Sequence, residues 1–231
     1  MSVDEGVRPG STADGLGKLR PAFAKDGTVT AGNASQISDG AAATIVCSAE
    51  KAEHLGLSPI ARVVAYHTSG VAPKDIFAAP IDGIAGVLDK AGLKATDIDL
   101  FEINEAFAAQ VLCNLKGLKD RGVAIPEEKL NICGGGIALG HPIGASGARV
   151  LTTLLHQLVR TGGKRGLAAL CLGGGQQRRD DRRAGLNDSR TAVHLNARAV
   201  LGTPSAKNCA SCVPPLRWFN GCDAVSCRGG P

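Results

Sequence analysis

The sequence feature that most constrains the fold is an alternation of short apolar runs and amphipathic segments between residues 61 and 172. Short apolar or β-branched runs predict strands, and apolar residues at intervals of three and four predict helices. We therefore expect strands at residues 61–66, 97–103, 130–133 and 166–172, and helices at residues 81–91, 105–116 and 144–161. Strands that alternate with helices predict an α/β fold, in which helices cover a sheet.

The segment before this alternation is less regular. Residues 1–25 are polar and rich in turn-forming Gly and Pro, and residues 27–30 predict a short strand. A helix is expected from Asp39 to Gly56. Cys47 in this helix and Cys113 in a later helix are expected to be buried core thiols.

Composition narrows the possible functions. The 231 residues suffice for one large domain or two small ones. No apolar run reaches the roughly 18 residues that a membrane-spanning helix needs, and the polar start does not resemble a secretory signal. We therefore expect a cytoplasmic protein with reduced thiols and no membrane partner. Residues 1–176 carry 17 basic and 17 acidic side chains, and residues 177–231 carry 9 and 4, which places the whole net charge of +5 after Gln176.

The densest chemical signal is the run NICGGGIALGHPIGASGAR at residues 131–149. It predicts a strand, a glycine-rich loop that holds His141, and a helix that begins near Gly144. A histidine fixed at a helix start suits acid/base or oxyanion chemistry near pH 7. The spacing matches neither the G-x-G-x-x-G motif nor a P-loop, so nucleotide binding is not expected. A tight turn with a structural histidine is the plain alternative.

Two further segments place polar side chains where a predicted strand ends. Cys171 follows a buried strand and precedes three glycines, so a substrate and backbone donors could reach its thiol. Asn104 lies where a strand turns into a helix and could hold a water molecule or cap the helix. The alternatives are a buried core cysteine and an ordinary helix cap.

Together, the motifs NEAF (104–107), GHPIGASGAR (140–149) and CLGGG (171–175) resemble the thiolase family. The segments LRPAF (19–23), GTVTAGNAS (27–35) and DGAAA (39–43) resemble it as well, so the likeness covers residues 1–176. The histidine motif is similar to that of the acetyl-CoA acetyltransferase branch. The resemblance implies a thiolase-like layered fold with a mixed sheet between helices. It also implies the reversible Claisen condensation of two acetyl-CoA molecules to acetoacetyl-CoA and CoA.

The resemblance further implies catalytic roles for individual residues. His141 would activate a nucleophilic cysteine and, with a water held by Asn104, would bind the thioester oxygen during enolate formation. Cys171 would deprotonate the second acetyl group, and the Gly173 amide would help to form an oxyanion hole.

Contacts with coenzyme A are implied in the same way. Ala34 and Ser35 would touch the pantetheine arm, Arg8 would lie near the nucleotide end, and Phe107 would wall the acyl pocket. Coenzyme A is then a substrate carrier, and neither a tightly bound cofactor nor a metal is expected. A homo-oligomer is expected for the full-length family.

The resemblance divides the chain into four segments. Residues 1–37 resemble the end of a CoA-binding loop domain, residues 38–59 a closing segment of the N-terminal domain, and residues 60–176 the C-terminal domain. None of the eight cysteines lies in the nucleophile's motif, so we expect the chain alone to be an inactive fragment. Residues 177–231 resemble no part of the family and are expected to be disordered. Their abrupt Arg-, Cys- and Pro-rich composition favours out-of-frame translation.

Three other functions remain open. The chain could be a non-catalytic, CoA-binding thiolase-like subunit. Four cysteines in the last segment could bind zinc, although the spacing of the second pair is loose: Cys209, Cys212, Cys222 and Cys227. The eight arginines of residues 177–231 could bind nucleic acid, but aromatic residues are not interleaved with them, so no nucleic-acid partner is expected.

Overall fold

The structure is a computed structural model that describes residues 3–172 and 192–196. Within the described residues, no helix combines the length and the hydrophobicity that crossing a bilayer requires. The elements in chain order are α1 (Ala13–Gly17), α2 (Ala49–His54), β1 (Arg62–His67), the 3-10 helix η1 (Pro73–Ala78), α3 (Ala79–Ala91), η2 (Ala95–Asp97), β2 (Leu100–Ile103), α4 (Ala108–Asp120), η3 (Glu127–Lys129), α5 (Gly136–Leu139), α6 (Ser146–Thr161), β3 (Arg165–Ala169) and β4 (Ala192–Asn196).

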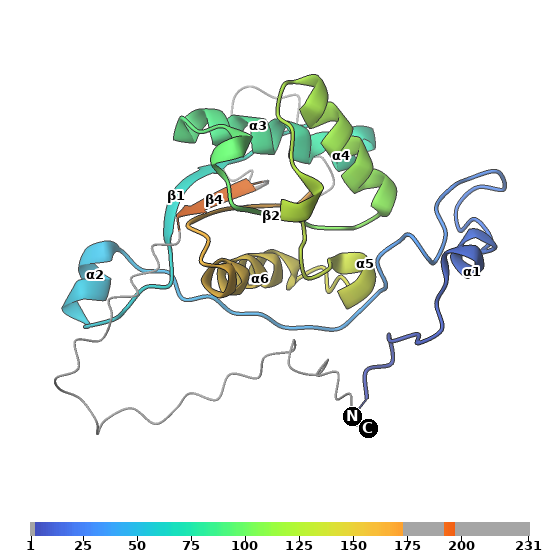
Figure 1. The fold of residues 1–231 in the computed structure, drawn as a ribbon, viewed down its shortest axis with the longest axis horizontal. Coiled ribbons are helices and arrows are strands. Elements are labelled where there is room, and N and C mark those ends of the chain that lie inside the picture. The colour runs from blue at the N-terminus through green and yellow to red at the C-terminus, as the bar shows by residue number, and fades with distance from the viewer. Residues whose placement is uncertain (1–2, 173–191, 197–231) are drawn as a thin grey trace. The chain divides into compact units, whose positions relative to one another are not determined.

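The strands form one mixed sheet in the order β1-β4-β3-β2 (Figure 1). β2 and β3 are parallel, and Ile103 lies opposite Ala169 at their carboxyl ends. β4 lies between β3 and β1 and is antiparallel to both. A parallel pair needs a crossover connection, which α4, α5 and α6 provide. The chain therefore leaves β2 and β3 at the same edge of the sheet.

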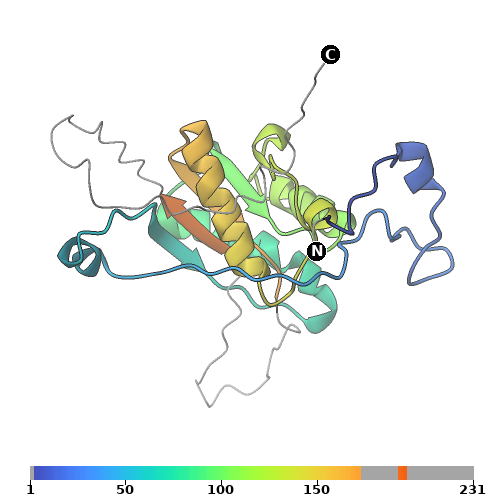
Figure 2. The same cartoon turned by 90° about the horizontal axis from the view of Figure 1, so that it is seen from below.

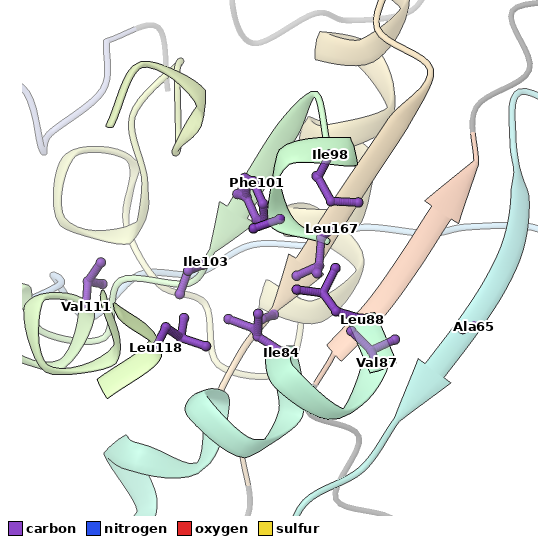
Figure 3. Packing of buried hydrophobic residues seen from close by; sticks show 12 residues of the cluster. Ala65, Ile84, Val87, Leu88, Ile98, Phe101, Ile103, Val111, Leu118 and Leu167 are labelled. Atoms are coloured by element: carbon purple, nitrogen blue, oxygen red, sulfur yellow. The ribbon is translucent and has the colours of Figure 1, made fainter. Parts of the chain in front are cut away.

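Helices cover both faces of this sheet. α3 and α4 pack on one face, and α6 lies across the other (Figures 1 and 2). Side chains alternate between the faces along β2, so Phe101 and Ile103 pack with α3 and α4, whereas Leu100 packs with α6. Figure 3 shows Ile84, Val87 and Leu88 of α3, which are 0 to 3 % exposed, in the hydrophobic core between the sheet and helices α3 and α4.

The expected α/β fold with a mixed sheet between helices is confirmed. α3 and α6 each end at a glycine in the left-handed conformation, Gly92 (φ 65°) and Gly162 (φ 72°), which ends the helix at little steric cost. α4 begins at Ala108, three residues later than the expected residue 105, because the chain is still extended at Phe107.

Two expected strands are wrong. Residues 27–30 form no strand, and only an isolated bridge joins Pro21 to Thr30. Residues 130–133 also make a single bridge, between Leu130 and Phe101. Asn131 adopts a left-handed backbone conformation (φ 47°), which ends the extended run after one residue.

The expected helix from Asp39 to Gly56 is also wrong over most of its length. Only α2 is helical, and the Ser48 hydroxyl caps its start by accepting a hydrogen bond from the Lys51 backbone N–H at 3.1 Å. Ile45 and Val46 before this cap are 95 % and 79 % exposed, so no packing stabilises a longer helix. Cys47 is exposed as well, and so is Cys113 on α4, contrary to the expectation that both are buried.

The sequence predicted no regular element after residue 176, yet the structure contains β4. Its five residues are too few to show a clear period in the sequence. The strand is stabilised by its position, because β1 and β3 both offer backbone hydrogen-bond partners to the segment between them. The rest of the segment predicted to be disordered lies outside the described residues.

Candidate active site

The edge of the sheet where β2 and β3 end brings together two of the predicted site residues. Asn104 directly follows β2, is 1 % exposed, and donates its backbone N–H to the Ala169 carbonyl at 2.9 Å. Cys171 follows β3 by two residues and is half-buried. Burial raises the pKa of the Cys171 thiol. A thiol with a raised pKa is a stronger base once it has lost its proton, which suits removal of a proton from carbon.

His141 reaches the same edge from the glycine-rich loop. Its backbone N–H donates to the Gln36 carbonyl at 3.2 Å, so residues 36–38 hold the loop in place. Gly140 before it has φ 92°, and a side chain there would also collide with Ser38. Asn104 Nδ2 lies 3.3 Å from His141 Nε2, which joins the strand end to the loop.

Hydrogen bonds on both sides of His141 define its tautomer. The Ser146 hydroxyl donates to the Pro142 carbonyl at 3.0 Å and therefore accepts from His141 Nδ1, which lies 2.5 Å away. Nδ1 thus carries the proton, and the lone pair of Nε2 accepts from Asn104. On the other side of Asn104, Arg149 Nη2 donates to Asn104 Oδ1 at 3.3 Å, which orients the amide.

Burial and nearby charges shift the pKa values of His141 and Glu102 in opposite directions. Burial lowers the pKa of His141, and the positive charge of Arg149 lowers it further. Glu102 is 2 % exposed, and burial raises its pKa to about 7, while Arg149 opposes part of this rise. Because side chains alternate along β2, Glu102 lies on the α6 side of the sheet, as Arg149 does. The lowered pKa of His141 favours the neutral form of its imidazole.

Hydrogen bonds to Glu105 hold the glycine-rich loop in place. Its carboxylate accepts from Asn131 Nδ2 at 2.9 Å and from the Ile137 backbone N–H at 3.2 Å. Asn131 also bonds both the N–H and the carbonyl of Ile103, at 2.8 and 2.9 Å. The loop passes so close to Glu105 that a side chain at Gly135 would overlap the carboxylate. These contacts fix the path of the chain toward His141.

The predicted CoA-contacting residues are partly assembled. Ala34 forms an isolated antiparallel bridge with Phe107, and the Ser35 backbone N–H donates to the Ala106 carbonyl at 3.0 Å. The Phe107 ring makes edge-to-face contacts with Phe23 and Phe77, at centroid distances of 6.0 and 5.2 Å. The segments GNAS and NEAF therefore pair through their backbones, and the Phe107 ring packs against two rings from other segments.

Two predicted site residues are not joined to this group. Arg8 is exposed in a turn, where its carbonyl accepts from the Gly10 and Ser11 backbone N–H groups. Gly173 lies outside the described residues.

A cavity of about 380 Å³ lies between residues 38–42 and residues 142–145, and it starts one residue beyond His141.

The sequence did not identify the partners of these residues. Ser146 and Arg149 lie five and eight positions after His141 in the GASGAR part of the motif, which was read only as a helix start. Glu102 and Glu105 flank Asn104 and were not singled out. A polar residue within a buried strand, as at Glu102, was the available signal.

The zinc hypothesis is not tested by the structure. Among residues 3–172 and 192–196, no group of three or more His, Cys, Asp or Glu side chains is placed to hold a metal ion. The four cysteines of the zinc hypothesis and all eight tail arginines lie outside the described residues, so both tail hypotheses stay predictions.

Comparisons with known proteins identify relatives of the chain. Residues 57–179 match the family model "Thiolase, C-terminal domain", and residues 1–50 match "Thiolase, N-terminal domain". An acetyl-CoA acetyltransferase of Chromobacterium violaceum is 54% identical over 175 residues, which are 76% of this chain and 43% of that protein. An acetyl-CoA acetyltransferase of Pseudomonas aeruginosa is 51% identical over 176 residues, or 76% of this chain and 44% of that protein.

Solved structures show the same likeness. The Bacillus anthracis acetyl-CoA acetyltransferase superposes with a TM-score of 0.73 and 44% identity, over 84% of this chain and 45% of that chain. A human mitochondrial 3-ketoacyl-CoA thiolase in complex with CoA superposes with a TM-score of 0.68 and 38% identity, over 85% of this chain and 45% of that chain. The chain thus spans less than half the length of these relatives.

Proposed function

The chain belongs to the thiolase family, and we propose that it carries the enolate-forming part of an acetyl-CoA acetyltransferase site. The overall reaction would join two acetyl-CoA molecules to give acetoacetyl-CoA and free CoA. The observation that carries this proposal is the hydrogen-bonded pair of Asn104 and His141 at the edge of the sheet where Cys171 follows β3.

His141 would move a proton at the nucleophile. Its Nε2 carries a lone pair in the neutral tautomer and can accept the proton of an attacking thiol. The imidazolium that results has an N–H at Nε2, which can donate to the oxygen of a thioester. Arg149 and burial lower the pKa of His141 and so favour return of the proton. We assign no described cysteine to the nucleophile, because none lies in the nucleophile's motif.

Cys171 would act on carbon. Its thiolate would take a proton from the methyl group of acetyl-CoA, and the electrons of that C–H bond would form the enolate. The negative charge then rests on the thioester oxygen, where an N–H of the Asn104 amide and, while His141 is protonated, its Nε2–H can stabilise it. Attack of the enolate carbon on the acyl thioester forms the new C–C bond and expels the nucleophile's thiolate, which recovers a proton.

Coenzyme A would be held as the substrate's carrier. The paired segments at Ala34, Ser35 and Phe107 offer an apolar surface with backbone polar groups, which suits a pantetheine arm. The likeness to the human thiolase in complex with CoA supports this proposal. The proposal also places Arg8 near the nucleotide of coenzyme A and the Gly173 amide in an oxyanion hole. It further expects the full-length enzyme to be a homo-oligomer. The cytoplasmic location stays a prediction from the sequence.

Exchange of the methyl protons of acetyl-CoA in D₂O tests the proposal, because this step needs the base and the oxyanion donors but no nucleophile. We expect ¹H NMR to show loss of the methyl signal at a rate above that of buffer. Cys171→Ala should abolish the acceleration, and Asn104→Ala should lower it by about 10²-fold, as is typical for loss of an oxyanion donor. Cys113→Ala, at an exposed thiol on α4, is the matched control and should leave the rate unchanged.

Calorimetric titration with CoA separates the possible outcomes. Binding together with Cys171-dependent exchange supports the proposal. Binding without exchange would overturn the catalytic part and favour a non-catalytic, CoA-binding subunit. Absence of both would overturn the proposal altogether.

A further inference from the structure

We infer that Arg149 is a positioning residue that sets the orientation of the Asn104 amide and thereby the direction of the hydrogen-bond chain through His141. The chain runs from Arg149 Nη2 to Asn104, His141, Ser146 and the Pro142 carbonyl. Arg149 lies on α6, whereas Asn104 follows β2, so the contact joins two layers of the fold.

The three groups in the middle of this hydrogen-bond chain do not set its direction. An asparagine amide, a neutral imidazole and a hydroxyl can each donate and accept, so all three could reverse together. In the reversed chain the Ser146 hydroxyl would donate to His141 Nδ1, and His141 Nε2–H would donate to Asn104 Oδ1. Direction must come from groups at the ends that can only donate or only accept.

The two ends of the hydrogen-bond chain differ in how strongly they set its direction. The Pro142 carbonyl only accepts, but it also receives the Ser146 backbone N–H at 2.9 Å, so it stays paired if the hydroxyl turns away. Arg149 only donates, and among the described residues it provides the one side-chain hydrogen bond to Asn104 Oδ1. With Arg149 in place, a reversed amide would present its NH₂ group to a guanidinium, and two donors would face each other.

The burial of Arg149 supports a role beyond stability. Its Nε and Nη1 atoms are buried and find no hydrogen-bond partner among the described residues. Buried donors without partners are costly, and a buried cation is more so. Glu102 on β2 and Glu105 after it offset part of this cost through their charges, although neither forms an ion pair with Arg149 in the described structure. Among the described residues, the one hydrogen bond of the Arg149 side chain is the bond to Asn104 Oδ1.

The direction of the hydrogen-bond chain decides whether Nε2 of His141 carries a lone pair or a proton. In the observed direction Nε2 carries a lone pair, which accepts from Asn104 and can take a proton when that hydrogen bond opens. In the reversed direction Nε2 carries a proton, and its base function is lost until the chain turns again. Burial and the nearby cation Arg149 also lower the pKa of His141. Glu102, Glu105 and Cys171 are further titratable groups near the ends of β2 and β3.

The imidazole ¹⁵N chemical shifts of His141 test the inference directly, because they distinguish the two tautomers. In the wild-type chain at pH 8 we expect the proton on Nδ1. In Arg149→Met we expect the Nε2–H tautomer to appear beside the Nδ1–H tautomer, because the Pro142 carbonyl alone then orients the hydrogen-bond chain. Asn104→Asp, whose carboxylate cannot donate, provides the reference spectrum of the reversed chain. Arg160→Met is the matched control on the same helix, because Arg160 bonds Gln157 and Cys133 instead, and it should leave the His141 spectrum unchanged.

An unchanged His141 tautomer in a folded Arg149→Met chain would overturn the inference. If that variant does not fold, Arg149→Gln serves instead. Its amide can donate or accept, so a mixture of tautomers is expected, and the wild-type spectrum alone would again overturn the inference. The inference concerns the site of the proposed function, but the spectra do not depend on turnover. Loss of proton exchange with a wild-type tautomer therefore points to a failure of the proposed function.

If the chain accelerates methyl-proton exchange, the same variants give a second measurement. Arg149→Met should lower the maximal exchange rate roughly in proportion to the fraction of the Nε2–H tautomer, because the turned Asn104 amide would no longer direct an N–H toward the thioester oxygen. The concentration of acetyl-CoA at half-maximal rate should stay unchanged, because Arg149 is not expected to touch the substrate. A change in that concentration alone would contradict the positioning role.

Discussion

At the scale of single residues, the site is a line of polar side chains drawn from distant parts of the sequence. Asn104 and Arg149 are 45 positions apart, and Asn104 and His141 are 37 apart. The sequence identified Asn104, His141 and Cys171, because each follows a strand or lies among glycines. It did not identify Ser146, Arg149 or Glu102, because their importance arises only when α6 packs against β2.

Glu102 leads to a prediction about stability and pH. Burial raises its pKa from an ordinary value of 4.5 to about 7, so the folded protein favours the protonated carboxyl. The stabilising effect of that proton is complete below about pH 4.5 and is lost as the pH rises through 7. We expect the free energy of unfolding to fall by about 3 kcal/mol over this range because of Glu102 alone.

Urea denaturation of the wild-type chain and of Glu102→Gln at pH 5 and pH 8 measures this effect. Gln resembles the protonated carboxyl, so the variant should lose most of the difference between the two pH values and be the more stable protein at pH 8. Glu128→Gln, at an exposed carboxyl on η3, is the matched control and should keep the wild-type difference. Equal pH dependence in wild type and Glu102→Gln would show that Glu102 does not titrate in this range.

At the scale of elements, the sequence predicted what local pattern controls. The amphipathic helices α3 and α6 and the buried strands β2 and β3 were found within a few residues, because each has a period and most end near a glycine or a turn. Residues 39–48 show the limit of this approach. Their apolar composition predicted a helix, but a helix forms only where a neighbouring surface covers its apolar side, and Ile45 and Val46 are exposed.

The loop before α5 depends on one close contact. A side chain at Gly135 would overlap the Glu105 carboxylate, which bonds Asn131 and Ile137. Gly135→Ala should therefore displace Glu105 and destabilise the chain by about 1–3 kcal/mol, the usual cost of overpacking. The displacement should also alter the His141 ¹⁵N spectrum, because the loop leads to His141.

Thermal unfolding and the His141 spectrum together check this prediction. Gly144→Ala is the control in the same motif, because a side chain there would meet nothing within 4 Å. Equal stability of the two variants, with an unchanged His141 spectrum in Gly135→Ala, would mean that the loop relaxes without moving the site.

At the scale of the whole molecule, the sheet depends on a strand that local sequence does not reveal. The α/β class and the parallel pair of β2 and β3 could be predicted from the alternation of elements, but the order β1-β4-β3-β2 could not. That order places Leu195 opposite Val63 on one side and opposite Gly166 on the other. The pairing of β4 with β1 joins segments more than a hundred positions apart, and no pattern within five residues encodes it.

Leu195→Pro tests whether β4 holds the sheet together. In a strand with neighbours on both sides, each backbone N–H faces one neighbour or the other, so proline removes a hydrogen bond and its ring disturbs the pairing. We expect a loss of about 3 kcal/mol or more, and faster amide hydrogen exchange throughout β1, whose partner among the described residues is β4 alone. β3 should be less affected, since it keeps its parallel pairing with β2. Ala43→Pro, in the exposed segment without regular structure, is the control and should change neither quantity. If β1 stays as protected in Leu195→Pro as in the wild type, β4 is not the strand that holds β1 in the sheet.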